Sequence, residues 1–190
     1  MQTITKTAAR IFPNIAARTK MQAKVLNSDD LENFMQERGI DGKIHILDVP
    51  TPTVELAAKA VNVDPDAIVK SILFLVDSVP VLVIACGTMT IDRSAVARMY
   101  GVGKKRVKLA PPDVVLSHTG YEVGAMPPFG HIQPIPTIMD PTILEQETVY
   151  AGGGAENALL RMEAHAIAEA TGAQLVSVQR QSQAPDSDQT

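Results

Sequence analysis

The stretch AIVKSILFLVDSVPVLVIAC, residues 67–86, decides the fold because it holds two apolar runs separated by a short polar turn. Residues 67–76 and 79–86 are rich in Val, Ile and Leu, which is typical of buried strands. A tight connection of polar residues between two such runs favours an antiparallel hairpin. The sequence therefore predicts a central hairpin with the other elements arranged around it.

Strand-like and helical patterns alternate irregularly on both sides of this hairpin. Helices are expected at residues 29–38, 54–61, 93–100, 111–117 and 163–171, and further strands at residues 43–49, 134–140, 147–154, 157–162 and 173–178. The expected N-caps are Ser28, Thr53 and Asp92, and the expected helix-ending glycines are Gly39, Gly101 and Gly172. An antiparallel hairpin within this irregular order favours an α/β (α+β) fold, with a mixed, barrel-like β-sheet surrounded by helices, over a doubly wound parallel sheet.

The 190 residues suit one domain, which we place at residues 27–178, between an N-terminal extension (residues 1–26) and a disordered tail (residues 179–190). Residues 1–20 contain four basic residues and no acid, so they fit either an organelle transit peptide or a loosely held extension with Met21 as a second start. The single cysteine, Cys86, lies in an apolar run and is expected to be a buried hydrophobe. It excludes an internal disulfide and favours a cytoplasmic location, and no apolar run reaches the length of a membrane span.

Common catalytic signatures are missing from the chain. It contains no phosphate-binding loop, no zinc-type spacing of Cys and His, and no nucleophile elbow. We therefore expect neither a metal nor a cofactor. The net charge of −4 argues against bulk attraction to nucleic acid, although KKRVK at residues 104–108 is either a solvated face or a local phosphate-binding patch.

Lys70 is unusual because nearly all its close neighbours in the first strand are apolar. An ammonium group in such surroundings is costly unless it meets an anion or reaches solvent. Two interpretations follow from the residues alone. Lys70 is either a solubilising lysine that faces solvent, or a cleft lysine that receives a phosphate or a carboxylate.

The segment HTGYEVGAMPPFGHIQP, residues 118–134, has too many glycines and prolines for a helix or a central strand. Its glycines allow close backbone approach to a ligand and its prolines stiffen the loop. Backbone N–H groups in such a loop suit a carbonyl oxygen or a developing oxyanion. The run AGGG, residues 151–154, could present donors in the same way, and either segment could instead be a plain turn.

The segments IVKSILF, HTGYEVGAMPPFG, PTIMD and VYAGGG follow one another in an order that resembles the YbaK/EbsC family. This family is related to the editing domain of bacterial prolyl-tRNA synthetases, and the resemblance covers about residues 27–178. It implies a mixed, barrel-like sheet surrounded by helices and hydrolysis of mischarged aminoacyl-tRNA in trans, without a metal or a covalent nucleophile. The alternative is a non-catalytic protein of the same fold that binds a nucleotide or an aminoacyl-nucleotide.

The resemblance also implies the site residues. Lys70 is expected near the phosphate of the terminal adenosine, and residues 124–128 hold the aminoacyl group. The residues implied in catalysis are Lys70, Gly124, Pro128 and His131, and those implied in substrate binding are Thr51, Tyr121, Met126, Phe129, Gly130, Asp140, Gly152 and Gly153. His131 is either a base that orients water or a loop histidine with one backbone hydrogen bond.

The implied partner is the acceptor end of a mischarged tRNA, with tRNA-Pro carrying Ala, Cys or another small amino acid as the expected substrate and prolyl-tRNA synthetase as a candidate partner. The sequence leaves the oligomeric state open. The chain departs from the resemblance after the glycine run, where the family often has a basic residue and this sequence has Ala155, Glu156 and Asn157.

Overall fold

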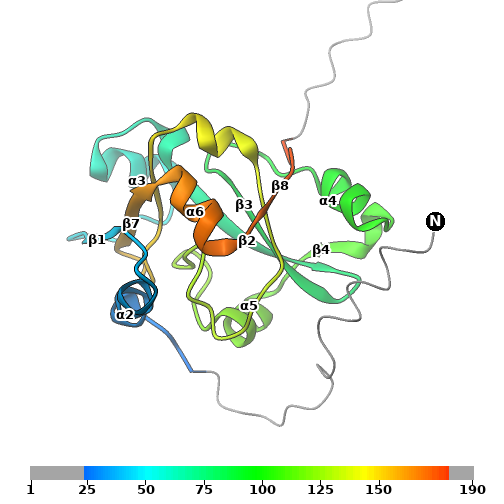
Figure 1. The fold of residues 1–190 in the computed structure, drawn as a ribbon, viewed down its shortest axis with the longest axis horizontal. Coiled ribbons are helices and arrows are strands. Elements are labelled where there is room, and N and C mark those ends of the chain that lie inside the picture. Colours follow the sequence, from blue (N-terminus) through cyan, green and yellow to red (C-terminus); the bar gives the residue numbers. More distant parts are fainter. Residues whose placement is uncertain (1–23, 180–190) are drawn as a thin grey trace, which may run out of the picture.

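The computed structural model describes residues 24–179, which form two β-sheets with helices packed around them (Figure 1). The helices are α2 (Ser28–Arg38), α3 (Val54–Val61), α4 (Arg93–Tyr100), α5 (Pro112–Thr119) and α6 (Ala164–Thr171), with 3-10 turns η1 (Pro65–Ala67), η2 (Lys104–Arg106) and η3 (Pro141–Glu145). The strands are β1 (Lys43–Ile46), β2 (Val69–Val76), β3 (Val79–Cys86), β4 (Val107–Leu109), β5 (Thr137–Met139), β6 (Thr148–Gly152), β7 (Ala158–Glu163) and β8 (Gln174–Leu175). None of these helices has the length and apolar character that crossing a membrane requires.

The predicted hairpin is confirmed and forms the centre of the larger sheet. Strands β2 and β3 pair antiparallel along their whole length, and the turn between them consists of Asp77 and Ser78 alone. Both turn residues have positive φ, 55° and 70°, as a two-residue turn that follows the strand twist requires. Arg106 fastens the turn, because its guanidinium pairs with the Asp77 carboxylate and its carbonyl accepts the Asp77 N–H at 3.0 Å.

The strands divide into two sheets. The larger sheet has the order β4-β2-β3-β5-β8 and is mixed, since β5 runs parallel to both β3 and β8. The smaller sheet, β1-β7-β6, is antiparallel. A parallel bridge between Ile68 and Tyr150 connects the two sheets at the start of β2. The mixed sheet with surrounding helices is as predicted, but the strands do not close into a barrel.

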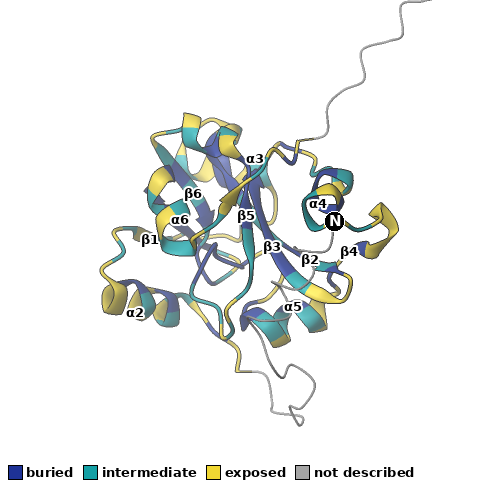
Figure 2. Ribbon diagram, turned by 45° about the vertical axis from the view of Figure 1, so that its right-hand side comes forward, coloured by how far each residue is buried: buried dark blue, intermediate teal, exposed yellow. Residues whose placement is uncertain are grey.

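The core lies around β3, whose residues 81–85 are completely buried (Figure 2). Ile138 and Met139 of β5 are buried beside it. Cys86 at the end of β3 is 6% exposed and belongs to this core, as expected for a small buried hydrophobe. The cytoplasmic location that its presence suggested stays a prediction.

Local capping signals locate the helices well, with one correction. Thr53 and Asp92 cap α3 and α4, and the three predicted glycines end their helices. The N-cap of α2, however, is Asn27 and not Ser28. The Asn27 side chain accepts hydrogen bonds from the N–H groups of Asp29 and Asp30, and the Asp30 carboxylate accepts the Asn27 N–H in return. This reciprocal capping box satisfies more donors than a serine one position later would.

The packed domain reaches slightly beyond the predicted limits. Leu26, placed in the N-terminal extension, is buried and its N–H donates to the Gly120 carbonyl at 2.7 Å. Gln179, placed in the tail, bridges to Ile91. The other predictions for the extension and the tail concern residues 1–23 and 180–190, which lie outside the described part of the chain.

The hairpin turn generates a stability prediction. Ser78 has φ 70°, a left-handed conformation that glycine adopts without steric cost. We expect Ser78→Gly to raise the free energy of unfolding by about 0.5 kcal/mol, and Ser78→Val to lower it by about 1 kcal/mol or more. Urea unfolding of the two variants measures both effects. A lower midpoint for Ser78→Gly than for the wild type would contradict the turn geometry.

Candidate active site

Lys70 lies on β2, and its side chain is partly buried. The ammonium donates hydrogen bonds to the carbonyl oxygens of Gly87, at 2.8 Å, and of Met89, both in the segment that follows β3. No carboxylate within 4 Å of the ammonium is found among residues 24–179. Because an ammonium has three N–H donors, one donor has no partner among the described residues. Lys70 is therefore held by the protein on one side and stays partly exposed, and its role as a cleft lysine remains a prediction.

The electrostatics of Lys70 favour an anionic ligand. Burial lowers the pKa of its ammonium, and the nearby Cys86 thiol acts in the opposite direction. The two carbonyl acceptors are neutral, so they do not balance the positive charge. An anion that binds at the remaining donor would stabilise the charged form and recover part of the desolvation cost.

The Gly/Pro loop crosses directly over the end of β6. A Cβ atom built on Gly152 would collide with the carbonyl oxygen of Met126 and would lie 2.9 Å from that of Ala125. The N–H of Gly154 donates to the Ala125 carbonyl at 3.0 Å. The glycine run and the proline loop are thus in backbone contact, and only a glycine at position 152 allows this approach.

Lys70 is brought to the same region by the junction between the sheets. Ile68 and Tyr150 form the parallel bridge, and β2 contacts β6. Two residues further along each strand are Lys70 and Gly152, which therefore occupy equivalent positions beyond the bridge. Three segments far apart in the sequence meet here: the lysine strand, the Gly/Pro loop and the glycine run.

The first half of the loop presents backbone donors. Gly124 is exposed, has φ 94°, and has open space where a side chain would begin. In the part of the chain that the structure describes, no protein acceptor faces the N–H groups of Gly124 and Met126. Pro127 and Pro128, which follow, are buried and hold the backbone direction.

The second half of the loop is anchored to the core. The Phe129 ring stacks on Phe34 of α2, with centroids 6.0 Å apart, and Gly130 packs against Leu31 of the same helix. Tyr121 is completely buried below the loop, and burial raises the pKa of its hydroxyl. The contacts of these three residues are with the core and with α2. They therefore hold the loop in place.

His131 also fastens the loop. Its Nε2 lies 3.0 Å from the Pro127 carbonyl oxygen, and its ring meets the edge of Tyr121. Since a carbonyl only accepts, Nε2 carries the proton. Burial lowers the pKa of His131 to about 4, and the hydrogen bond to Pro127 acts in the opposite direction. The imidazole is thus neutral near pH 7, and its geometry fits the loop histidine with one backbone hydrogen bond.

Asp140 has a structural role. It is completely buried, and its Oδ1 accepts the N–H and the hydroxyl of Thr142 at 3.0 and 2.7 Å. Its Oδ2 accepts the N–H of Val178 at 2.7 Å, which ties the C-terminal segment to β5. With both oxygens engaged and no exposure to solvent, Asp140 is not included among the residues that we propose to contact a substrate.

The N–H groups of Gly153 and Gly154 already have acceptors within the protein. The suggestion that residues 151–154 offer donors to a ligand therefore does not hold for these two glycines. The N–H of Gly153 donates to Ala158 at 2.9 Å, and that of Gly154 is taken by Ala125. The residues that follow have structural contacts. Thr51 donates its N–H to the Glu156 carbonyl, and Asn157 exchanges two hydrogen bonds with Leu47. Thr51 therefore lies beside the segment that follows the glycine run. Asn157 in this segment binds Leu47, whereas the family often has a basic residue in this part of the sequence.

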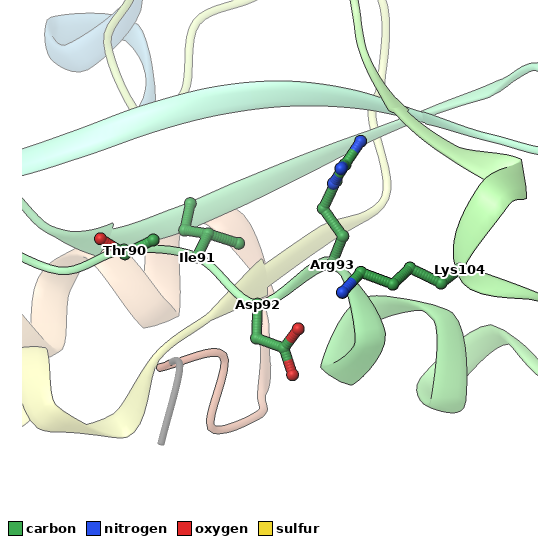
Figure 3. A pocket seen from close by; sticks show the side chains of 5 residues that line it. All are labelled: Thr90, Ile91, Asp92, Arg93 and Lys104. Carbon is green, nitrogen blue, oxygen red and sulfur yellow. The ribbon is translucent and has the colours of Figure 1, made fainter. Parts of the chain in front are cut away.

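A pocket of about 310 Å³ begins one residue after Met89, which accepts a hydrogen bond from Lys70. It is lined by Thr90, Ile91, Asp92, Arg93 and Lys104 (Figure 3). Sequence reasoning missed it, because its two sides come from α4 and η2. Two separate signals for its lining were present in the sequence, the N-cap at Asp92 and the basic run that begins at Lys104. Within residues 24–179, no group of three or more His, Cys, Asp or Glu side chains could hold a metal ion.

The structure defines an α+β domain in which the Gly/Pro loop contacts the end of β6, and β6 bridges the start of the strand that carries Lys70. Residues 48–170 match the aminoacyl-tRNA editing domain family. The chain belongs to this family, and the resemblance to YbaK/EbsC proteins is confirmed.

Three proteins illustrate what the chain is similar to. A solved structure described as a "putative trans-editing enzyme for prolyl tRNA synthetase" superimposes with a TM-score of 0.76 at 29% sequence identity, covering 81% of this chain and 97% of that one. The hypothetical protein APE2540 gives a TM-score of 0.74 at 32% identity, covering 80% and 99%. The uncharacterized protein YwhH of Bacillus subtilis (strain 168) is 28% identical over 118 residues, which are 62% of this chain and 73% of that protein.

The contact below the loop predicts that Gly152 tolerates no side chain. We expect Gly152→Ala to lower the free energy of unfolding by about 2 kcal/mol or more, because the new methyl group collides with the backbone of Ala125 and Met126. Gly103→Ala is the matched control, since its Cβ meets nothing within 4 Å and its φ is −73°. Urea unfolding compares the two. Equal stability of both variants would refute the contact.

The buried imidazole predicts a pH dependence of stability. The folded-state pKa of His131, about 4, is below the ordinary value of about 6.5. The unfolded chain therefore takes up the proton first as the pH falls, and stability present above pH 6.5 is lost between about pH 6.5 and 4. Between pH 7 and 5 we expect the wild type to lose about 1–2 kcal/mol more than His131→Gln.

Denaturant unfolding at the two pH values measures this difference. His165→Gln is the control, because His165 is exposed and its removal leaves the buried ring in place. An identical pH dependence for the wild type and His131→Gln would show that His131 is not buried in its neutral form.

Proposed function

We propose that this protein is an aminoacyl-tRNA deacylase that acts in trans, with tRNA-Pro carrying Ala, Cys or another small amino acid as its substrate. The observation that carries the proposal is the ammonium of Lys70, which is held by two carbonyls and has no carboxylate within 4 Å among the described residues. Its strand starts at the bridge to β6, the strand over which the Gly/Pro loop passes. Family membership supports the reaction class. The prolyl-tRNA synthetase relationship of one structural relative supports the tRNA.

Lys70 is proposed to bind the phosphate of the terminal adenosine. Its third N–H donor is open to a ligand, and its partly buried charge is stabilised when an anion arrives. This contact would fix the ribose and its ester relative to the protein. Orientation of this kind lowers the activation barrier for hydrolysis of an already activated ester by several kcal/mol.

The first half of the loop is proposed to hold the aminoacyl carbonyl. The N–H groups of Gly124 and Met126 lack acceptors within the described residues, so they can donate to the oxyanion that develops when water attacks. In this reaction the water oxygen bonds to the carbonyl carbon, the bond to the ribose oxygen breaks, and the water proton ends on that oxygen. A hydroxyl of the substrate is proposed to relay the proton, because His131 is held by Pro127 and Asp140 by Thr142 and Val178.

The substrate assignment is tested with a panel of mischarged tRNAs. Alanyl- and cysteinyl-tRNA-Pro are expected to be hydrolysed, and correctly charged prolyl-tRNA-Pro to be spared. Hydrolysis of no member of the panel, together with binding of AMP or an aminoacyl-adenylate analogue, would instead select the non-catalytic nucleotide-binding protein.

Replacement of Lys70 tests the site. We expect Lys70→Met to lower kcat/KM on the hydrolysed tRNA by about 10- to 100-fold, the size typical of losing one hydrogen bond to a charged group such as the substrate phosphate. The variant should keep its unfolding midpoint, because the costly partly buried charge is removed with its hydrogen bonds. Lys59→Met on the exposed face of α3 is the control. Equal activity of the two variants would rule out Lys70 as a substrate-binding group.

A further inference from the structure

Six exposed cationic residues lie on three elements of the described chain that pack close together, and we call this set the basic surface. Its members are Arg93 and Arg98 of α4, Lys104, Lys105 and Arg106 of η2, and Lys108 of β4. The chain between Arg93 and Lys108 contains no Asp or Glu, although the whole protein has a net charge of −4. Positive charge is therefore concentrated on one part of an acidic protein.

Packing brings these residues together. Helix α4 contacts both η2 and β4, and the three elements lie side by side at one end of the larger sheet (Figure 1). Lys108 on the edge strand β4 could serve to prevent pairing with another sheet. This explanation does not extend to the other five members, which lie on a helix and on a 3-10 turn.

Two acids face the basic surface, and both already have structural roles. Asp92 caps α4 by accepting the Ser94 N–H at 2.8 Å, and that hydrogen bond, with the nearby charges of Lys104 and Arg98, lowers the pKa of its carboxyl. Asp77 pairs with Arg106 in the hairpin turn. The charge of the remaining members is thus largely uncompensated by the described residues.

The pocket lies between two members of the basic surface and the segment that accepts a hydrogen bond from Lys70. Arg93 and Lys104 line one part of this pocket, and Thr90 lines another part (Figure 3). Thr90 directly follows Met89, whose carbonyl oxygen accepts a hydrogen bond from Lys70. From Met89 to Arg93 the chain spans at most about 14 Å, the length of about four nucleotides along a stacked strand.

We propose that the basic surface binds the phosphate backbone of the tRNA acceptor stem and directs its end toward Lys70. This inference rests on the proposed function. Nucleic acid is the partner that fits, because its phosphates lie in a regular row and exposed Lys and Arg side chains bind them without reading the sequence. The attraction is local, so it is compatible with the acidic net charge.

Charge reversal tests the basic surface. The double variant Lys104→Glu, Lys105→Glu leaves the Arg106–Asp77 pair intact. The matched control is Lys43→Glu, Arg161→Glu, an exposed cross-strand pair on the smaller sheet. Binding of uncharged tRNA-Pro is measured by filter retention at several salt concentrations.

We expect the basic-surface variant to bind tRNA at least tenfold more weakly than the control at about 0.1 M salt, and its log–log salt slope to be shallower by about one for each phosphate that it no longer binds. In kinetics, kcat/KM on the mischarged tRNA should fall at least tenfold more than on the aminoacyl ester of adenosine, which has no stem. The decrease should appear in KM.

Three results distinguish a failure of this inference from a failure of the proposed function. Equal tRNA binding and equal salt slopes for the basic-surface variant and the wild type would overturn the inference. So would equally weakened binding by the control, because the attraction would then not be local. If the wild type cleaves neither substrate, the proposed function fails, while the binding measurement still decides whether this surface holds tRNA.

Discussion

The close approach of the Gly/Pro loop to the end of β6 is the constraint on which the rest of the site depends. Gly152 lets the backbone of Ala125 and Met126 pass directly over the strand, and the Gly154 N–H fastens the loop there. Because β6 is joined to the start of β2 by the Ile68–Tyr150 bridge, the same contact fixes the loop relative to Lys70. A rigid sheet junction thus positions backbone groups that a free loop would leave undefined.

The chemistry of the site follows from where charge is placed. The ammonium of Lys70 is partly buried against neutral carbonyls, whereas the carboxylate of Asp140 and the ring of His131 are engaged in holding the fold together. The groups without a described partner are one donor of Lys70 and the N–H groups of Gly124 and Met126, and these are the groups that we propose to contact the substrate. Groups of these kinds suit the binding of an anionic ester and the stabilisation of charge that develops on it.

The helices and the hairpin were predictable because their signals are local. Thr53 and Asp92 cap the helices that follow them, and the alternation of apolar residues with a polar turn identified β2 and β3. The misplaced cap at Ser28 also has a local reason, since Asn27 and Asp30 form a reciprocal pair that a single position does not reveal. The site was predictable only in part. Its residues could be named through the family resemblance, but their separate roles could not.

The sequence by itself determined the order of the elements, the central hairpin and the membership in an editing family. Only the tertiary structure decided that Gly152 is needed for close packing, that Asp140 ties down the C-terminal segment, and that Lys70 is held by Gly87 and Met89. The physical reason is the separation in sequence between the residues that are in contact. Caps and turns join residues two to four positions apart, whereas these contacts join residues 17 or more positions apart and exist only after the two sheets have packed.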